Sequence, residues 1–432
     1  MRRAIAFTGT IKQSKYITFK EIKPDKNNNW LNQLNDDFYK YYKIVSENGP
    51  FYARKTGIQT SRDPWITNYS SNNLQDNVKF FINNYEKERE RIKLEGKYDD
   101  DKLNYNSEEI SWSSSLKNSV KRDISVEYDK DKIHQVTYRP FTKRYIYVDK
   151  TLIHRPGSID EIFPNNKKNL IINTSGNGGS KPFSALITNQ ITDVNILEAS
   201  AKSYPFYVYN EDESLFENDH SNINDRFIST LNNKFDIKVD EEDVFYYIYG
   251  LFHHPEYLNS FAHDLKREPP RIPISNNLLE ISNVGRKLAD IHLNYEEVEP
   301  YEDVDIIIEK ENPSFYVEKM IHPWAKDKNN KRVKDDSGKY YRDKSQIVFN
   351  SDIIIKNIPE KAYGYVVNGR SPIEWIIDQY KVKTDSKSQI ENNPNLYSDD
   401  PKYIFNLLLS LINVSIQTVD LVNSLPPLEI EE

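Results

Sequence analysis

The sequence predicts a mixed α/β (α+β) protein, in which a helical spacer is followed by a largely antiparallel sheet domain with flanking helices. Two observations support this fold class. Apolar residues recur with helical spacing at 76–95 and again at 240–252. From residue 124 to 209, short apolar runs of strand length are separated by turn sequences rich in proline and glycine. We therefore divide the chain into a spacer at 1–112 and a sheet domain at 113–432.

The spacer is predicted mainly from one amphipathic helix. In DNVKFFINNYEKERERIKLE (76–95), Val78, Phe81 and Tyr85 fall on one helical face before a charged stretch. A second helix is expected within 110–123, where a run of serines precedes an apolar period.

Six segments of the middle region have the pattern of strands. They alternate or run apolar with β-branched and aromatic residues, and they read ISVEY, IHQVTY, RYIYV, NLIINTS, KPFSALITN and SYPFYVYN. RPF, RPG and GNGGS lie between them and predict turns. TSGNGGS (174–180) lacks the GxGxxG spacing of a nucleotide-binding loop, which favours a hairpin loop over a phosphate site.

The C-terminal half is predicted to contain helices and short strands, with no internal repeat. Asp240 is suited to cap a helix at 240–252, and Ser371, followed by Pro372 and Glu374, is suited to cap another at 372–380. The other expected elements are helices at 258–265, 277–293 and 400–422, and strands at 303–309, 314–321 and 347–355.

Composition excludes several classes of protein. The chain has no cysteine, so disulfides, thiol catalysis and Cys-ligated zinc are ruled out. The longest apolar stretch, IFNLLLSLINVSI, has 13 residues including Asn and Ser, whereas a membrane span needs about 18 apolar residues or more. The N-terminal apolar run is too short for a signal peptide. We expect a soluble, cytoplasmic protein without a membrane partner.

Charge is distributed unevenly along the chain. The formal net charge is −8, yet residues 117–181 contain 13 basic and 7 acidic side chains. Within this region, TYRPFTKRYIYVDKTLIHRPG (137–157) places four Tyr or Phe residues among its basic ones. Acidic residues gather at 211–243, with 11 acids and 3 bases, and at 296–311, with 8 acids and 1 base.

A basic, aromatic-rich strand region is the type of surface that binds nucleic acid. Lys and Arg neutralise phosphates, and Arg can grip guanine edges. Two structural explanations stay open: alternation could simply place basic residues on a solvated face, and the arginines of RPF and RPG could stabilise their own turns. The acidic clusters would repel DNA and should face away from it.

The sequence contains no recognisable catalytic motif. His253, His254 and His263 lie close together but without metal-ligand spacing. NPSF (312–315) lacks the second proline of an amino-methyltransferase loop, and no cofactor-binding glycine loop precedes it. No Walker box or nuclease arrangement is evident either.

Six stretches carry a resemblance that composition alone does not explain: WLNQLNDDFYKYYKI (30–44), FYARKTGIQTSRDPWITNYS (51–70), VTYRPFTKRYIYVDKTLIHRPG (136–157), DVFYYIYGLFHHPEYLNSFAHDLKREPPRIPI (243–274), VGRKLADIHLNYE (284–296) and GYVVNGRSPIEWIIDQYKVKTDSKSQIENNPN (364–395). In that order they resemble the C-terminal part of type ISP restriction–modification enzymes. The stretches together span nearly the whole chain.

The resemblance implies a position within a larger enzyme. Enzymes of this family join a nuclease, a helicase-like ATPase, a coupler, an N6-adenine methyltransferase and a domain that reads a DNA target. Residues 1–112 would correspond to the methyltransferase tail or spacer, and 113–432 to the specificity domain. The expected partners are double-stranded DNA and the upstream catalytic portion, supplied by a split gene or a longer chain. S-adenosylmethionine, ATP and Mg²⁺ would belong to that portion, and no cofactor is expected here.

The resemblance also suggests roles for ten basic residues. At the DNA we expect Arg139, Lys143, Arg144 and Arg155, with Lys121, Arg122 and Lys181 on its backbone. A second basic loop near the methyltransferase would contain Arg54, Lys55 and Arg62, where it could brace a strand from which a base is extruded. The alternative function is a decayed or stand-alone interaction protein that keeps the fold without activity.

Overall fold

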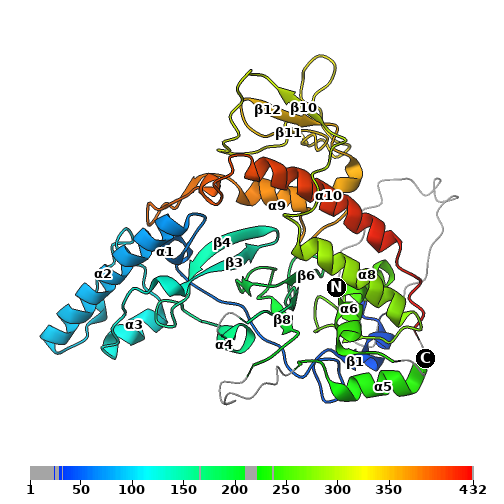
Figure 1. Ribbon diagram of the computed structural model, residues 1–432, viewed down its shortest axis with the longest axis horizontal. Coiled ribbons are helices and arrows are strands. Elements are labelled where there is room, and N and C mark those ends of the chain that lie inside the picture. Colours follow the sequence, from blue (N-terminus) through cyan, green and yellow to red (C-terminus); the bar gives the residue numbers. More distant parts are fainter. Residues whose placement is uncertain are drawn as a thin grey trace.

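The computed structural model describes residues 24, 29–31, 33–164, 167–209, 221–235 and 238–430. The first part of the predicted spacer and part of the acidic segment 211–243 lie outside the described residues. The helices are α1 Asp63–Ile66, α2 Ser71–Glu95, α3 Ser114–Lys121, α4 Ile159–Ile162, α5 Asp225–Phe235, α6 Glu241–Leu251, α7 Pro255–Ser260, α8 Leu278–Leu293, α9 Pro372–Gln379 and α10 Tyr403–Asn423 (Figure 1).

The strands are short and form five small sheets. They are β1 Tyr42–Lys43, β2 Thr67–Asn68, β3 Ile133–Arg139, β4 Thr142–Tyr147, β5 Ile171–Thr174, β6 Ala185–Thr188, β7 Ile191–Thr192, β8 Lys202–Pro205, β9 Arg271–Ile272, β10 Asp305–Ile308, β11 Ile347–Val348, β12 Ile353–Lys356, β13 Lys383–Thr384 and β14 Glu391–Asn392. Among these strands only β3 and β7 pair in parallel, so the predicted mixed, largely antiparallel fold is confirmed.

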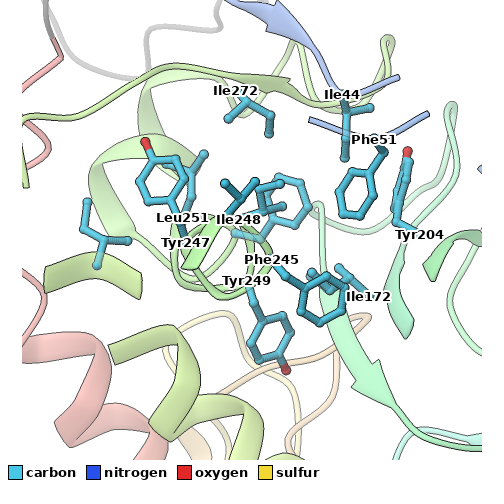
Figure 2. Packing of buried hydrophobic residues seen from close by; sticks show 14 of the residues in the cluster. Ile44, Phe51, Ile172, Tyr204, Phe245, Tyr247, Ile248, Tyr249, Leu251 and Ile272 are labelled. Carbon is cyan, nitrogen blue, oxygen red and sulfur yellow. The ribbon is translucent and has the colours of Figure 1, made fainter. Parts of the chain in front are cut away.

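One core forms between α6, α8 and the sheet of β5, β6 and β8, in the lower half of Figure 1. Figure 2 shows Phe51 and Tyr204 facing Phe245 of α6, with Ile172 of β5 beside them. The helices α6 and α8 approach closely because Gly250 and Gly285 face each other's helix. A Cβ at Gly285 would lie 2.0 Å from the Tyr246 carbonyl oxygen.

A second core is built around α10. This helix is long and apolar enough to cross a membrane by composition, but 61% of its most apolar window is buried against α9, β11, β12 and α8. We therefore interpret α10 as a core helix of this fold. Figure 1 shows α9 and α10 between the sheet of β10, β12 and β11 and the sheet that contains β3 and β4.

A third core contains residues from both sides of residue 112. Phe81 of α2, Leu116 of α3 and Ile146 of β4 belong to one buried cluster. The apolar face of α2 packs against elements on both sides of residue 112, because the same cluster also contains Trp65 of α1. The spacer helix and the strand region form one packed unit.

Most element predictions are confirmed, and the capping residues explain why. Asp240 and Asp243 form a capping box at α6, and Ser371 and Glu374 form another at α9. Three strand predictions need correction. ISVEY (124–128) forms no strand, and β3 begins only at Ile133. Residues 314–321 form only isolated bridges, and 347–355 divides into β11 and β12 because the chain turns back on itself.

Candidate nucleic-acid interface

Two adjoining cavities form a continuous polar groove beside the β3–β4 hairpin. Their volumes are about 420 and 450 Å³, and both are lined by Asp63, Pro64 and Asp385. One wall comes from residues 59–65 and from Tyr138, Arg139 and Arg144; the other comes from 378–392, which includes β13 and β14. The Asn68 amide donates to the Glu391 carbonyl at 3.2 Å and joins the two walls, and Figure 1 shows the segment after α9 reaching toward α1.

Arg144 is the most exceptional side chain of the groove. Its guanidinium carbon lies 4.0 Å from the centroid of the Tyr138 ring and 4.6 Å from that of Tyr69. The buried Nε has no hydrogen-bond partner, and no carboxylate of the described residues forms an ion pair with this arginine. Stacking on two rings fixes the position of the guanidinium.

The neighbouring polar groups are hydrogen-bonded to one another. The Tyr138 hydroxyl donates to Asp63 at 2.7 Å, and Arg139 donates to the buried Asp193 carboxylate at 2.8 Å. Burial raises the pKa of Asp193 above its usual value, although Arg139 acts in the opposite direction. Burial also raises the pKa of Tyr138, and the Asp63 carboxylate adds to this effect. Tyr138 therefore stays a neutral donor that orients both arginines.

Arg62 lines the groove but its side chain is directed into the protein. It is only 2% exposed, and its guanidinium donates to the carbonyls of Ser111 and Leu152 and to the Ser113 hydroxyl. Burial lowers its pKa to about 10, which still leaves it charged near neutral pH. In this conformation Arg62 fixes the loop before α1 to the start of α3, and its donors are already used.

Replacing Arg62 with methionine is expected to lower the free energy of unfolding by about 2–3 kcal/mol, because two carbonyls lose a charged donor. Denaturant titration of the full chain measures this change. Arg54, which is exposed, provides the control: R54M should leave stability within about 0.5 kcal/mol of the parent. Equal stability of R62M and the parent would contradict the structural role.

The structure does not gather the other seven predicted residues in this groove. Lys143 occupies the opposite face of β4 from Arg144 and pairs with Glu296 at 2.7 Å. Lys55 pairs with Glu161. Arg155 is exposed, and its backbone forms an isolated β-bridge with Gln59 at the edge of the groove. The rest are exposed elsewhere: Arg54, Lys121 and Arg122 at the end of α3, and Lys181 against Gly369.

The sequence analysis missed the basic residues of the second wall. Lys381, Lys383 and Lys387 line the groove from the segment that contains β13 and β14. The signal was present in KVKTDSKSQ, where basic residues recur every two to four positions within one of the six family-like stretches. The excess of basic residues at 117–181 is larger and points only to the opposite wall.

The groove combines hydrogen-bond donors with acceptors. Its charged lining consists of Arg62, Arg139, Arg144, Lys381, Lys383 and Lys387, together with Asp63, Asp193, Asp378 and Asp385. A purely phosphate-binding surface needs only cations, whereas base edges present both donors and acceptors. Within the described residues, no group of three or more His, Asp or Glu side chains is arranged to hold a metal ion.

Comparison with known proteins gives a consistent result. The family model described as the type ISP C-terminal specificity domain matches residues 50–407, so the match begins well ahead of residue 113. The chain is similar to a nuclease-deletion mutant of the type ISP restriction–modification enzyme LlaGI, solved in complex with a DNA substrate mimic. The two are 38% identical with a TM-score of 0.81, over 96% of this chain and 37% of that one.

Two further solved structures are similar. The ATP-dependent type ISP enzyme LlaBIII bound to DNA is 35% identical, with a TM-score of 0.81, over 95% of this chain and 26% of that chain. A DrdV–DNA complex, at 24% identity and a TM-score of 0.76, shares the fold over 96% of this chain and 41% of that chain. The chain thus spans less than half the length of each. None of the curated proteins compared with it matches.

Proposed function

This chain belongs to the type ISP C-terminal specificity domain family, and from that premise we propose that it reads a double-stranded DNA target through the groove beside the β3–β4 hairpin. The observation that carries the proposal is Arg144, whose guanidinium is held by two tyrosine rings and has no carboxylate partner among the described residues. Such a guanidinium can donate two parallel hydrogen bonds to guanine O6 and N7.

The remaining groove residues are suited to two kinds of contact, with phosphates and with base edges. Lys383 and Lys387 are exposed on the second wall and suited to phosphates, which position the duplex. Asp63, Asp385 and the groove amides offer acceptors that can discriminate against the wrong base. Arg155, at the groove edge, is a further candidate for a backbone contact.

We further propose that the chemistry belongs to the rest of a type ISP enzyme. N6-adenine methylation and ATP-dependent cleavage would be carried out by the methyltransferase, helicase and nuclease portions, which would bind S-adenosylmethionine, ATP and Mg²⁺. The chain itself would direct these activities to the target and would act in the cytoplasm, where cellular DNA is accessible.

Selection from a pool of random duplexes tests this proposal. The full chain should retain duplexes that share one consensus sequence, and its affinity should fall with salt at a log–log slope of about −0.9 per phosphate contacted. Retention without any consensus, or no retention, would instead favour an interaction protein that keeps the fold without reading DNA.

A further inference from the structure

Residues 325–348 contain three consecutive eight-residue units, contrary to the prediction of no internal repeat. The units read AKDKNNKR, VKDDSGKY and YRDKSQIV, and each has an apolar or aromatic residue, then a basic residue, then aspartate. The aspartates are Asp327, Asp335 and Asp343. Each unit is too short and too polar to show the hydrophobic periodicity of a helix or strand. The sequence of 325–348 is therefore typical of a charged loop.

Each aspartate closes a tight turn. The Asp327 carboxylate accepts the backbone N–H groups of Asn329 and Lys331 at 2.8 and 2.9 Å. Asp335 accepts those of Ser337 and Lys339, both at 2.9 Å, and Asp343 accepts that of Ser345 at 3.0 Å. The Ser337 hydroxyl donates to Asp335 at 2.7 Å, and this hydrogen bond, with those from the backbone, lowers the pKa of Asp335. These three acids are therefore used to shape the backbone.

The turns are tied together at equivalent positions of the repeat. The Val333 N–H donates to the Ala325 carbonyl at 2.9 Å, and the Ala325 N–H donates to the Tyr341 carbonyl at 3.0 Å. Isolated β-bridges also pair Trp324 with Arg342, Lys326 with Arg332, and Lys334 with Tyr340. We call residues 324–346 the basic knob. It extends from the sheet of β10, β12 and β11, on the other side of α9 and α10 from β3 and β4 (Figure 1).

The basic side chains of the knob are left on its surface. The knob has eight basic and four acidic residues, and all eight basic side chains are exposed. The guanidinium carbons of Arg342 and Arg332 lie 3.7 and 5.0 Å from the centroid of the Trp324 ring. Five lysines form no ion pair with a carboxylate of the described chain: Lys326, Lys328, Lys331, Lys334 and Lys339.

We infer that the basic knob is a second DNA-binding surface, which contacts phosphates of the duplex outside the base pairs read by the groove. The inference rests on the proposed function, because it takes the partner to be the same DNA. In an acidic protein, a unit with eight basic and four acidic residues, five of whose lysines form no ion pair within the described chain, presents concentrated positive charge to a polyanion. The contacts are sequence-independent, since lysines neutralise phosphates without reading bases.

The test replaces turn lysines that take no part in stacking. K328Q/K331Q/K339Q in the full chain should reduce the salt-dependence slope by as much as about 3, roughly 1 for each lysine on a phosphate. Affinity at about 0.1 M salt should fall tenfold or more. Because these contacts read no bases, the selected target duplex and a scrambled duplex should lose affinity by the same factor.

The matched control is K87Q/K97Q/K287Q, which removes three exposed lysines from helices or a helix end outside the knob and changes the net charge equally. It should keep the parent slope. An unchanged slope and affinity in the knob variant would overturn the inference, and so would an equal loss in the control. If the parent selects no target, the proposed function fails, while the knob is still tested on the scrambled duplex.

Discussion

Replacing Arg144 with methionine is expected to reduce the preference for the target duplex over a scrambled duplex by about 10- to 100-fold, the value of one well-placed bidentate contact to a base. Methionine keeps much of the aliphatic volume between Tyr69 and Tyr138 but removes the donors. Competition binding of the two duplexes at one fixed salt concentration measures the ratio. Affinity for the scrambled duplex should change much less.

Lys143 provides the control for this experiment. It is the next residue along β4, on the opposite face, and its ammonium is paired with Glu296. K143Q should keep the target preference, and thermal unfolding should show that both variants are folded. Full preference in R144M would contradict the assignment of Arg144 as a base reader.

Stability is expected to fall below pH 6.5 because two buried histidines must stay neutral in the folded protein. The Tyr249 hydroxyl contacts His292 Nδ1 at 2.6 Å, Thr418 contacts its Nε2 at 2.9 Å, and Tyr365 stacks on the ring. Burial lowers the pKa of His253 to about 4. It lowers the pKa of His292 well below the usual value, and His253 contributes to the decrease.

The free energy of unfolding falls as the pH falls because the unfolded chain binds more protons than the folded chain. Below pH 6.5 the unfolded chain takes up protons at these histidines while the folded chain does not, so folding loses free energy until the folded pKa is reached. For His253 the loss should be about 2 kcal/mol between pH 6.5 and 5. Urea titrations at pH 7.5 and 5 measure it. H253Q/H292Q should lose most of this pH dependence; a parent equally stable at both pH values would contradict the buried, neutral state.

The helices were predictable because their signals are local. Asp240 and Ser371 mark helix starts within four residues, and the apolar face of α2 is visible in its spacing. The groove was not predictable in this way. Its walls come from 59–65, 138–144 and 378–392, which only tertiary packing brings together.

Residue type also could not decide between structural and binding roles. Arg62 and Arg144 both lie in basic, aromatic stretches of the sequence. Arg62 donates to the carbonyls of Ser111 and Leu152, whereas Arg144 lines a cavity. The difference arises from tertiary packing: Arg62 donates to Ser113 at the start of α3, about 50 residues away in the sequence. Net charge indicated the strand pair that lines the groove, but not the face of β4 on which Arg144 lies.

A structure of the full chain bound to its selected duplex tests the groove assignment most directly. We expect the duplex against the β3–β4 hairpin, with the Arg144 guanidinium within hydrogen-bond distance of a base edge and the β13–β14 segment on a phosphate. A duplex seated on another face, with Arg144 still facing only solvent and its two tyrosines, would contradict it.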